Sequence, residues 1–267
     1  MKKTAQEKQA KKAKFEFVPK RWIVPALTAV MVLILIINAI VFNSRSTNNV
    51  DPEQSASPSA IINADNISLP NPDFKSSSSI ESVLRSRRTR RAFQDTQLSL
   101  KQVSQMLWAA QGITVDWGGR TAPSAKSTYP LSIFLIANDV AGLEPGEYQY
   151  ISGDRTPVHQ LKPLKQVELQ KSIFEALNES SFQHAPAVLI ITGSMGKMAE
   201  AYGGIPHDKE VYLEAGHAAQ NLYLQAESLK LGMVTITGFD ADKILGLVTI
   251  PDTDTIIYLI PFGIPKL

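Results

Sequence analysis

The sequence contains no cysteine, few histidines and few aromatic residues. Without cysteine, the 267-residue chain has no disulfides, no thiolate metal ligands, no cysteine nucleophile and no lipid-anchored cysteine. Its four histidines lack the spacing of a metal site, so no metal is expected. Hydrophobic residues make up 44% and charged residues 19%, which suits a globular domain joined to a more apolar segment.

The small net charge of +2 hides an uneven distribution along the chain. Residues 1–21 contain eight lysines and arginines against two glutamates, so this tail carries +6. The rest of the chain has 19 basic and 23 acidic residues and therefore carries −4. Because nucleic-acid binding needs a broad basic surface, this mildly acidic body argues against a nucleic-acid partner.

Residues 22–42 form an uncharged run in which Thr28 and Asn38 are the only polar side chains. At about 1.5 Å per residue, this run crosses a hydrocarbon core of about 30 Å, which predicts a transmembrane helix. A cleaved signal peptide and a buried core helix are the alternatives, but the run is long for the first and is followed directly by polar sequence. The basic tail before it predicts a single-pass protein of the cell membrane with a cytoplasmic N-terminus and its domain on the outer face.

Residues 43–79 are rich in Ser, Asn, Asp and Pro without apolar periodicity, which predicts a flexible linker or a wrapping arm. A folded domain is expected over residues 80–267. Its patterns predict helices over residues 99–112, 164–178, 209–231 and 240–247, and strands over residues 131–137, 148–151, 187–192, 233–237 and 255–261. Because helices and strands mix without regular alternation, the predicted fold class is α+β, with helices packed around one sheet.

Five arginines fall within the seven residues Arg85–Arg91, inside a body that is otherwise acidic. Clustered guanidinium groups beside a hydroxyl suit a phosphate, through charge-assisted and bidentate hydrogen bonds. A solvated basic helix end and a contact with lipid headgroups are the alternative interpretations of this cluster.

Two loops have compositions that suit close approach of a ligand. Residues Thr121–Pro130 are mostly small or hydroxyl-bearing, although such a loop is often only a connector. In the second loop, Gly238 follows an expected strand and permits a positive φ or close backbone approach. The alternative for the second loop is an ordinary turn, with Asp240 as the N-cap of the next helix.

A polar stripe follows the longest expected helix. Glu214, His217, Asn221 and Gln225 recur at spacings of three and four, which places them on one face. Such a stripe lines a site or, more often, satisfies buried backbone groups or an interface.

The order of several strings along residues 80–265 resembles the nitroreductase-like FMN flavoproteins: RSRRTRRAF, LSLKQVSQMLWAAQGIT, RTAPSAKSTYPLSIFL, LEPGEYQY, LEAGHAAQNLYLQAESLKLGM, TGFD and IYLIPFG. The branch that it most resembles includes the azoline dehydrogenases of thiazole and oxazole peptide biosynthesis. The resemblance implies an α+β sandwich that forms a homodimer with two FMN sites at its interface. It also implies an oxidoreductase that transfers hydride from NADH or NADPH through FMN to an organic acceptor, such as a quinone or a nitro compound.

The resemblance further implies where FMN is bound. The matching positions are Arg87, Arg88, Thr89, Arg91, Pro123, Ser124, Ala125, Lys126, Ser127, Thr237, Gly238 and Lys266. The first four would hold the phosphate and the ribityl chain, and the next five would form a loop that passes the flavin. Thr237 and Gly238 would lie near the flavin N5 atom, and Lys266 would join the phosphate. No side chain is expected to act as a nucleophile.

One departure from the branch concerns a base. The azoline dehydrogenases share a Lys-Tyr pair ahead of the long helix. At the matching positions this chain has Ala201 and Tyr202. Removal of a proton and a hydride needs a base, so azoline oxidation is disfavoured unless Lys209 or another residue replaces that lysine. A dehydrogenase of an azoline-type peptide or a small amine is therefore the second hypothesis, and a flavin-binding sensor or scaffold without turnover is the third.

Overall fold

The computed structural model of the protein describes residues 65–266. The predicted basic tail over residues 1–21, the predicted transmembrane helix over residues 22–42 and most of the predicted linker lie outside this range, so they stay predictions. Within residues 65–266, no helix combines the length and the apolar character that crossing a bilayer requires.

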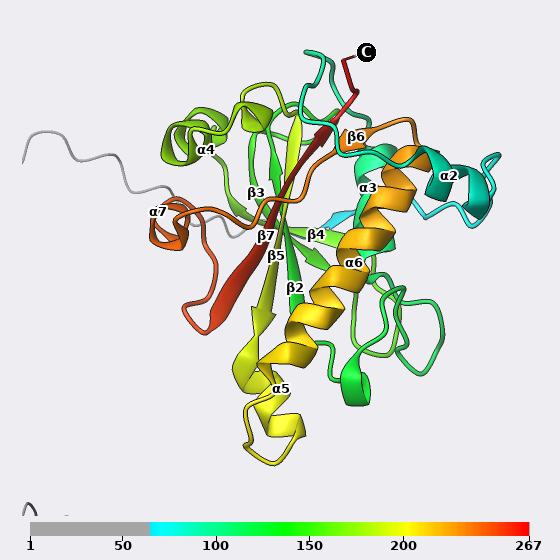
Figure 1. The fold of residues 1–267 in the computed structure, drawn as a ribbon, viewed down its shortest axis with the longest axis vertical. Helices are drawn as coiled ribbons and strands as arrows, with labels where there is room; N and C mark the ends of the chain where they lie inside the picture. Colours follow the sequence, from blue (N-terminus) through cyan, green and yellow to red (C-terminus); the bar gives the residue numbers. More distant parts are fainter. Residues whose placement is uncertain (1–64, 267) are drawn as a thin grey trace, which may run out of the picture. The chain divides into compact units, whose positions relative to one another are not determined.

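A seven-stranded sheet forms the centre of the described domain (Figure 1). Its order is β1-β4-β3-β2-β5-β7-β6, and neighbouring strands pair antiparallel throughout. The strands are β1 (Ile67–Ser68), β2 (Leu131–Ala137), β3 (Gly146–Ile151), β4 (Gln160–Lys165), β5 (Ala187–Ser194), β6 (Gly232–Met233) and β7 (Asp254–Gly263).

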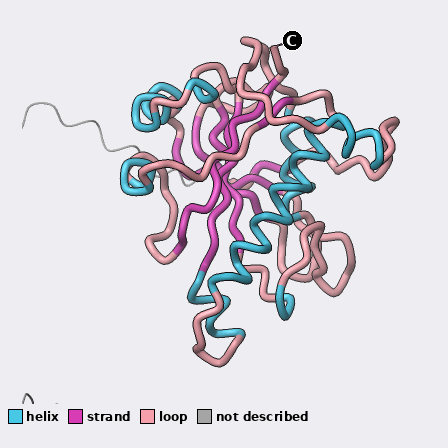
Figure 2. The backbone as a smooth tube through the Cα atoms, in the orientation of Figure 1, coloured by secondary structure: helices cyan, strands magenta, loops and turns pink. Residues whose placement is uncertain are grey.

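Helices cover both faces of this sheet. They are α2 (Ile80–Ser86), α3 (Leu100–Gln111), α4 (Gln170–Leu177), α5 (Met195–Ala201), α6 (Asp208–Ser228) and α7 (Ala241–Leu245). The ribbon and the backbone tube show α3 and α6 on one face and α4 and α7 on the other (Figures 1 and 2). The predicted α+β sandwich of helices around one antiparallel sheet is thereby confirmed.

The central strands are apolar at nearly every position because helices cover both of their faces. Successive side chains of a strand point to opposite faces. Ile133 and Leu135 of β2 accordingly belong to the core beneath α3 and α6, while Phe134 and Ile136 belong to the core beneath α4 and α7. A strand buried on both sides reads as a continuous apolar run, which is why the sequence predicted β2 with its observed bounds.

The helix predicted over residues 99–112 is confirmed as α3, together with its capping box. The Ser99 hydroxyl accepts a hydrogen bond from the Gln102 backbone N–H at 3.2 Å, and the Gln102 side chain accepts one from the Ser99 N–H at 2.9 Å. Gly112 is the C-cap. The capping box therefore defines the start of this helix, and the Gly112 backbone N–H, which donates to the Trp108 carbonyl, closes its end.

Two predicted elements are corrected by the structure, and two short helices were not predicted. The helix expected over residues 164–178 begins only at Gln170, because β4 occupies Gln160–Lys165 and its Pro163 hid the strand signal. The strand expected over residues 233–237 shortens to β6, followed by one bridge between Ile236 and Leu259. Helices α2 and α5 were not predicted, since seven residues are too few to show a helical period.

Residues 65–79, the described part of the predicted linker, lie against the domain. Strand β1 pairs with β4 at the edge of the sheet. The Asp73 backbone exchanges two hydrogen bonds with the Gln105 side chain of α3, at 2.8 and 3.1 Å. The Phe74 ring meets Trp108 edge-on, with ring centroids 5.5 Å apart. This segment is therefore an arm that runs across α3.

Replacing Ser99 with alanine removes the hydroxyl of the capping box and leaves an N–H of the first turn of α3 without its partner. The free energy of unfolding is expected to fall by about 1 kcal/mol. Urea unfolding followed by circular dichroism measures the change, and Thr96→Ala, which removes an exposed hydroxyl outside any helix, is the control. A loss no larger than that of the control would contradict the role given to the box.

Candidate functional site

The arginine segment, residues Arg85–Arg91, lies at the C-terminal end of α6. Helix α2 ends at Arg87, and the chain then runs extended beside β6 and the last residues of the domain. The Arg90 N–H donates to the Met233 carbonyl at 3.0 Å, and the Lys266 N–H donates to the Ala92 carbonyl at 2.9 Å. These segments are far apart in sequence but gather at one end of the fold, where Figure 1 shows α2, the end of α6, β6 and the C-terminus.

Tyr223 of α6 links the parts of this site. Its hydroxyl lies 3.2 Å from the Thr89 hydroxyl and accepts a hydrogen bond from the Thr235 N–H at 3.2 Å. The Arg87 guanidinium lies over its ring, 5.1 Å from the centroid. Burial alone would raise the pKa of the Tyr223 phenol, but hydrogen bonds with Thr235 and Thr89 and the Arg87 charge outweigh burial and lower it. The sequence did not predict Tyr223 or Thr235 as site residues.

The arginines of the segment differ in their partners. Arg90 is half-buried and pairs with Glu227 of α6 at 2.8 Å. By contrast, no carboxylate within residues 65–266 forms an ion pair with Arg87, Arg88 or Arg91. Arg88 donates to the backbone carbonyls of Arg85 and Arg87, at 3.0 and 2.8 Å. Guanidinium groups without counter-charges, on residues that flank a threonine in the sequence, are the kind of donors that a phosphate requires. The residues present therefore fit a phosphate-bearing ligand.

Two further predicted positions lie in the loop after β6, where the neighbouring Ile236 and Phe239 pack with the core beneath α4 and α7. Thr237 and Gly238 are exposed in the loop between β6 and α7, shortly after Thr235. Gly238 does not have a positive φ, and a Cβ built there meets no atom within 4 Å. Its backbone is therefore open to a ligand. Asp240 is the N-cap of α7, as the alternative interpretation of this loop proposed, although without a side-chain capping bond.

The second group of predicted residues, Pro123–Ser127, lies toward the other end of α6. The Lys126 ammonium donates to the Ala201 carbonyl of α5 at 2.9 Å and sits 4.0 Å from the centroid of the Tyr202 ring. Helix α5 lies at the N-terminal end of α6, which extends over 21 residues, or about 30 Å (Figure 1). One chain therefore keeps Lys126 apart from the arginine segment.

The backbone of this loop is strained. Three residues have φ values in the left-handed region, which residues other than glycine rarely adopt. The values are 52° for Lys126, 53° for Ser127 and 48° for Tyr129. Each such residue costs on the order of 1 kcal/mol, and the conformation persists only where surrounding contacts fix it. Strain of this kind is concentrated at functional sites.

The contact of Lys126 with Tyr202 also bears on the missing base. The chain has Ala201 at the position where the azoline dehydrogenases share a lysine. Lys209 is the residue that the sequence offers as a replacement for that lysine. Lys126, which comes from a distant loop, places its ammonium group against both Ala201 and Tyr202. A lysine and a tyrosine thus meet in space at the position where the sequence pair is broken.

The polar stripe of α6 mostly holds neighbouring elements. The Asn221 amide donates to the Thr121 carbonyl at 3.0 Å, and Gln225 accepts a hydrogen bond from the Gln105 amide at 3.1 Å. Glu214 is buried and accepts a hydrogen bond from the Gln111 amide of α3 at 3.4 Å, whereas His217 is exposed. Of the four residues, Asn221 satisfies a backbone group, as the more common role of such a stripe predicts, while Gln225 and Glu214 bond side chains of α3.

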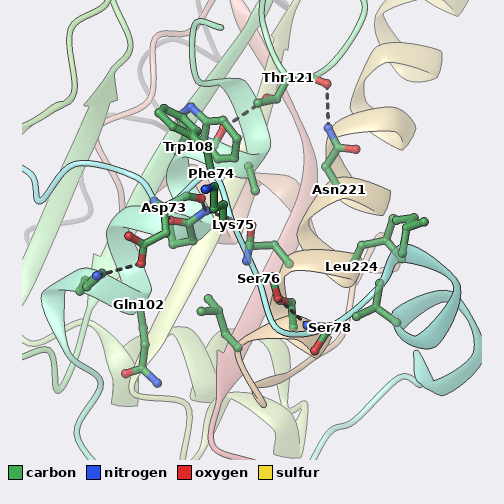
Figure 3. A pocket seen from close by; sticks show the side chains of 18 of the residues that line it. Asp73, Phe74, Lys75, Ser76, Ser78, Gln102, Trp108, Thr121, Asn221 and Leu224 are labelled. Atoms are coloured by element: carbon green, nitrogen blue, oxygen red, sulfur yellow. Dashed lines mark hydrogen bonds and ion pairs between the residues drawn. The ribbon is translucent and has the colours of Figure 1, made fainter.

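Two grooves open beside the arm. The first, of about 590 Å³, lies between the arm, α3 and the C-terminal half of α6, where Phe74, Trp108 and Asn221 face it (Figure 3). The second, of about 920 Å³, lies between the arm and the end of β3, and includes Tyr150 and His159. None of the predicted cofactor residues lines either groove, so the grooves do not mark the predicted site.

The comparisons with known proteins agree with this fold. The sequence model described as the nitroreductase family matches residues 84–264. A Methanocaldococcus jannaschii protein that carries the name nitroreductase is 36% identical over 184 residues, which cover 69% of this chain and 90% of that protein. The structure of a protein called a nitroreductase from Ralstonia eutropha covers 78% of this chain and 94% of its own, with 25% identity and a TM-score of 0.64.

Two other solved structures share the fold at lower identity. The structure of a nitroreductase of Anabaena variabilis has 24% identity and a TM-score of 0.59 over 70% of this chain, which spans 38% of that longer protein. The Escherichia coli microcin synthetase complex includes a chain with 21% identity and a TM-score of 0.53, over 75% of this chain and 78% of that one. The resemblance predicted from the sequence is confirmed: the chain belongs to the nitroreductase family of oxidoreductases.

Proposed function

We propose that the protein is an FMN-dependent oxidoreductase that transfers hydride from NADH or NADPH to an organic acceptor, such as a quinone or a nitro compound. The observation that carries this proposal is that Arg87, Arg88 and Arg91, which flank Thr89 in the sequence, form no ion pair with a carboxylate in the described domain, while Arg87 and Thr89 both contact Tyr223. In a member of the nitroreductase family, such a group supports the binding of a flavin phosphate. Membrane anchoring through residues 22–42 stays a prediction from the sequence.

The chain's own residues bind and orient the cofactor, while FMN supplies the hydride chemistry when bound. The guanidinium groups of Arg87, Arg88 and Arg91 would donate to the phosphate. The Thr89 hydroxyl, which lies 3.2 Å from the Tyr223 hydroxyl, would add a further contact with the phosphate. Lys266 adds a fourth cation from the C-terminal end, whose backbone is bonded to Ala92.

The loop after β6 would act on the flavin ring. Thr237 and Gly238 are exposed, and the preceding Thr235 is fixed by its hydrogen bond to Tyr223. Backbone N–H groups held in this way stabilise negative charge that develops on a ring during reduction. No nucleophilic side chain is required.

We propose that a second copy of the chain completes the site. Large apolar side chains, Ile205, Tyr212 and Leu213, are half or more exposed at the N-terminal end of α6, which marks a surface suited to association. In a two-fold pairing with antiparallel α6 helices, the N-terminal end of one helix meets the C-terminal end of the other. The Lys126 loop of one chain would then lie beside the arginine segment of its partner.

The full chain, purified and supplied with FMN, is expected to sediment as a dimer with a visible flavin band that bleaches on anaerobic addition of NADH or NADPH. Adding a quinone should restore the band. Bound flavin that neither nucleotide reduces would favour a flavin-binding sensor without turnover, or the dehydrogenase of an azoline-type peptide or small amine that is discussed below. A protein that does not bind FMN would contradict the proposed function. A monomer that binds one FMN per chain would contradict the shared site.

The double variant Arg87→Ala/Arg88→Ala removes two charge-assisted contacts with the phosphate. Such bonds contribute roughly 1.5–3 kcal/mol each, so FMN affinity should fall by at least about 100-fold. Titration of flavin fluorescence measures the loss. The control Arg155→Ala/Lys162→Ala removes the same charge from exposed positions away from α6 and should bind FMN normally. Tight FMN binding by the double variant would contradict the assignment of the phosphate site.

A second candidate function, a dehydrogenase of an azoline-type peptide or a small amine, is favoured by the contact of Lys126 with Tyr202. Desaturation removes a hydride and a proton together, and the proton needs an acceptor. Lys126, placed where the paired lysine is missing, would take that proton as a neutral amine, after losing the proton that it carries as an ammonium. Tyr202 would keep this side chain in place through its ring.

Lys126→Met is expected to abolish oxidation of an azoline-containing peptide at saturating FMN, while bleaching by NADH or NADPH continues. The methionine keeps a long side chain but cannot accept a proton. Liquid chromatography with mass spectrometry follows the loss of two hydrogens from the peptide. Lys162→Met, at an exposed position of β4, is the matched control. Equal peptide oxidation by wild type and Lys126→Met would remove this candidate.

A further inference from the structure

A half-buried histidine connects the sheet to the arm. His159, just before β4, lies between Tyr150 of β3 and Ser104 of α3. The Tyr150 hydroxyl is 2.9 Å from Nδ1 of the imidazole, and the Ser104 hydroxyl is 2.6 Å from Nε2. Ser104 in turn donates to the Pro70 carbonyl of the arm at 2.6 Å. Three hydrogen bonds in series therefore run from the sheet through His159 to the arm.

The donors and acceptors of this series fix where its protons lie. A carbonyl only accepts, so the single hydroxyl proton of Ser104 is used on Pro70. The imidazole must then donate to Ser104 from Nε2, which leaves Nδ1 to accept the proton of Tyr150. Every donor of the series has an acceptor only while His159 is neutral.

A second proton on His159 breaks this order. Protonated Nδ1 would donate to the Tyr150 oxygen, and the Tyr150 proton would lose its acceptor, since this hydroxyl has no other hydrogen-bond partner within residues 65–266. Tyr150 is 7% exposed and Ser104 is 1% exposed, so water offers little replacement. Burial lowers the pKa of His159, although the Pro70 carbonyl partly opposes this.

The charged groups around His159 give an imidazolium no partner. No carboxylate of the described domain forms an ion pair with it. On the side of β3, the charged group is the Arg120 guanidinium, which donates to the loop after that strand. On the side of α3, Lys101 pairs with Asp73 of the arm at 2.8 Å. Asp116 borders the second groove together with His159, but it is exposed to solvent.

The backbone of His159 also holds the arm. Its carbonyl accepts a hydrogen bond from the Leu69 N–H at 2.9 Å, and the next residue of the arm is Pro70, which the side-chain series reaches. The arm forms a wall of both grooves, and Phe74 and Trp108 border each of them. The contacts of His159 with the arm therefore help to determine the shape of both grooves.

We propose that His159 is a pH-sensitive latch, which holds the arm against α3 while the imidazole is neutral and releases it when the imidazole is protonated. Because the pKa of His159 is lowered in the folded chain, the latch is closed at and above the ordinary histidine pKa of about 6.5. It opens as the pH falls through the lower pKa of the folded chain. The latch depends neither on FMN nor on hydride transfer.

Hydrogen exchange of the full chain without cofactor, followed by mass spectrometry from about pH 7 to about pH 5, tests the latch. Exchange is compared with the rate of the unfolded chain at each pH. The protection of residues 68–75 is expected to fall about tenfold over this range, while that of β2 and β5 stays unchanged. Constant protection of the arm across this range would overturn the proposal.

Two variants identify the group that titrates. His159→Gln cannot be protonated, so the protection of its arm should be the same at both ends of the pH range. Ser104→Ala cuts the connection between the imidazole and Pro70, so its arm should be released at both. His217→Gln, at an exposed position of α6, is the matched control and should keep the wild-type pH dependence. A pH dependence that survives in His159→Gln would mean that another group titrates, and the latch would be wrong.

The fluorescence of Trp108 gives a second readout that needs no change in the series itself. With Trp22→Phe and Trp117→Phe, Trp108 is the only tryptophan of the full chain. Release of the arm takes the Phe74 ring away from Trp108, so quenching by acrylamide should rise about twofold as the pH falls. Quenching that stays constant would mean that the arm remains on α3, which contradicts the proposed release.

Discussion

The close packing of α6 on the central strands is the interaction on which every part of the candidate site depends. The helix approaches the sheet through small buried side chains, among them Ala215, Ala218 and Ala219. Gly193 of β5 also permits this close approach, because a Cβ atom at that position would lie 2.4 Å from the Val211 side chain of α6. With its path fixed in this way, α6 presents different side chains to the site at each of its ends.

The two ends of α6 have different chemical roles. At the C-terminal end, Tyr223 and Glu227 organise the arginine segment, so that one guanidinium is neutralised and others stay available to a ligand. Toward the N-terminal end, α5 and the residue after it, Tyr202, contact the loop that carries Lys126. A helix of about 30 Å keeps these groups apart within one chain. A two-fold axis is the simplest operation that brings unlike ends together, which is why the proposed function includes a homodimer.

Much of the fold follows from local patterns in the sequence. The apolar runs of β2 and β5, buried on both faces, and the capping box at Ser99 each carry a signal that does not depend on distant residues. Short or interrupted elements were missed for the same reason. The strand β4 contains Pro163, and α5 spans only about two turns, so neither shows a repeated apolar pattern long enough to be recognised. What stabilises them is packing against neighbours, and a local pattern does not record that packing.

For the site, the sequence by itself determined the composition: an arginine cluster in an acidic body, a loop of small and hydroxyl residues, and a motif order that identified the family. Only the tertiary structure decided which of these groups meet. It brought Tyr223 to Thr89, and it placed Lys126 against Tyr202, across 76 positions of the chain. The physical reason is that the type of each residue fixes its own side-chain chemistry. Contacts between distant segments form only when the whole sheet is buried beneath its helices.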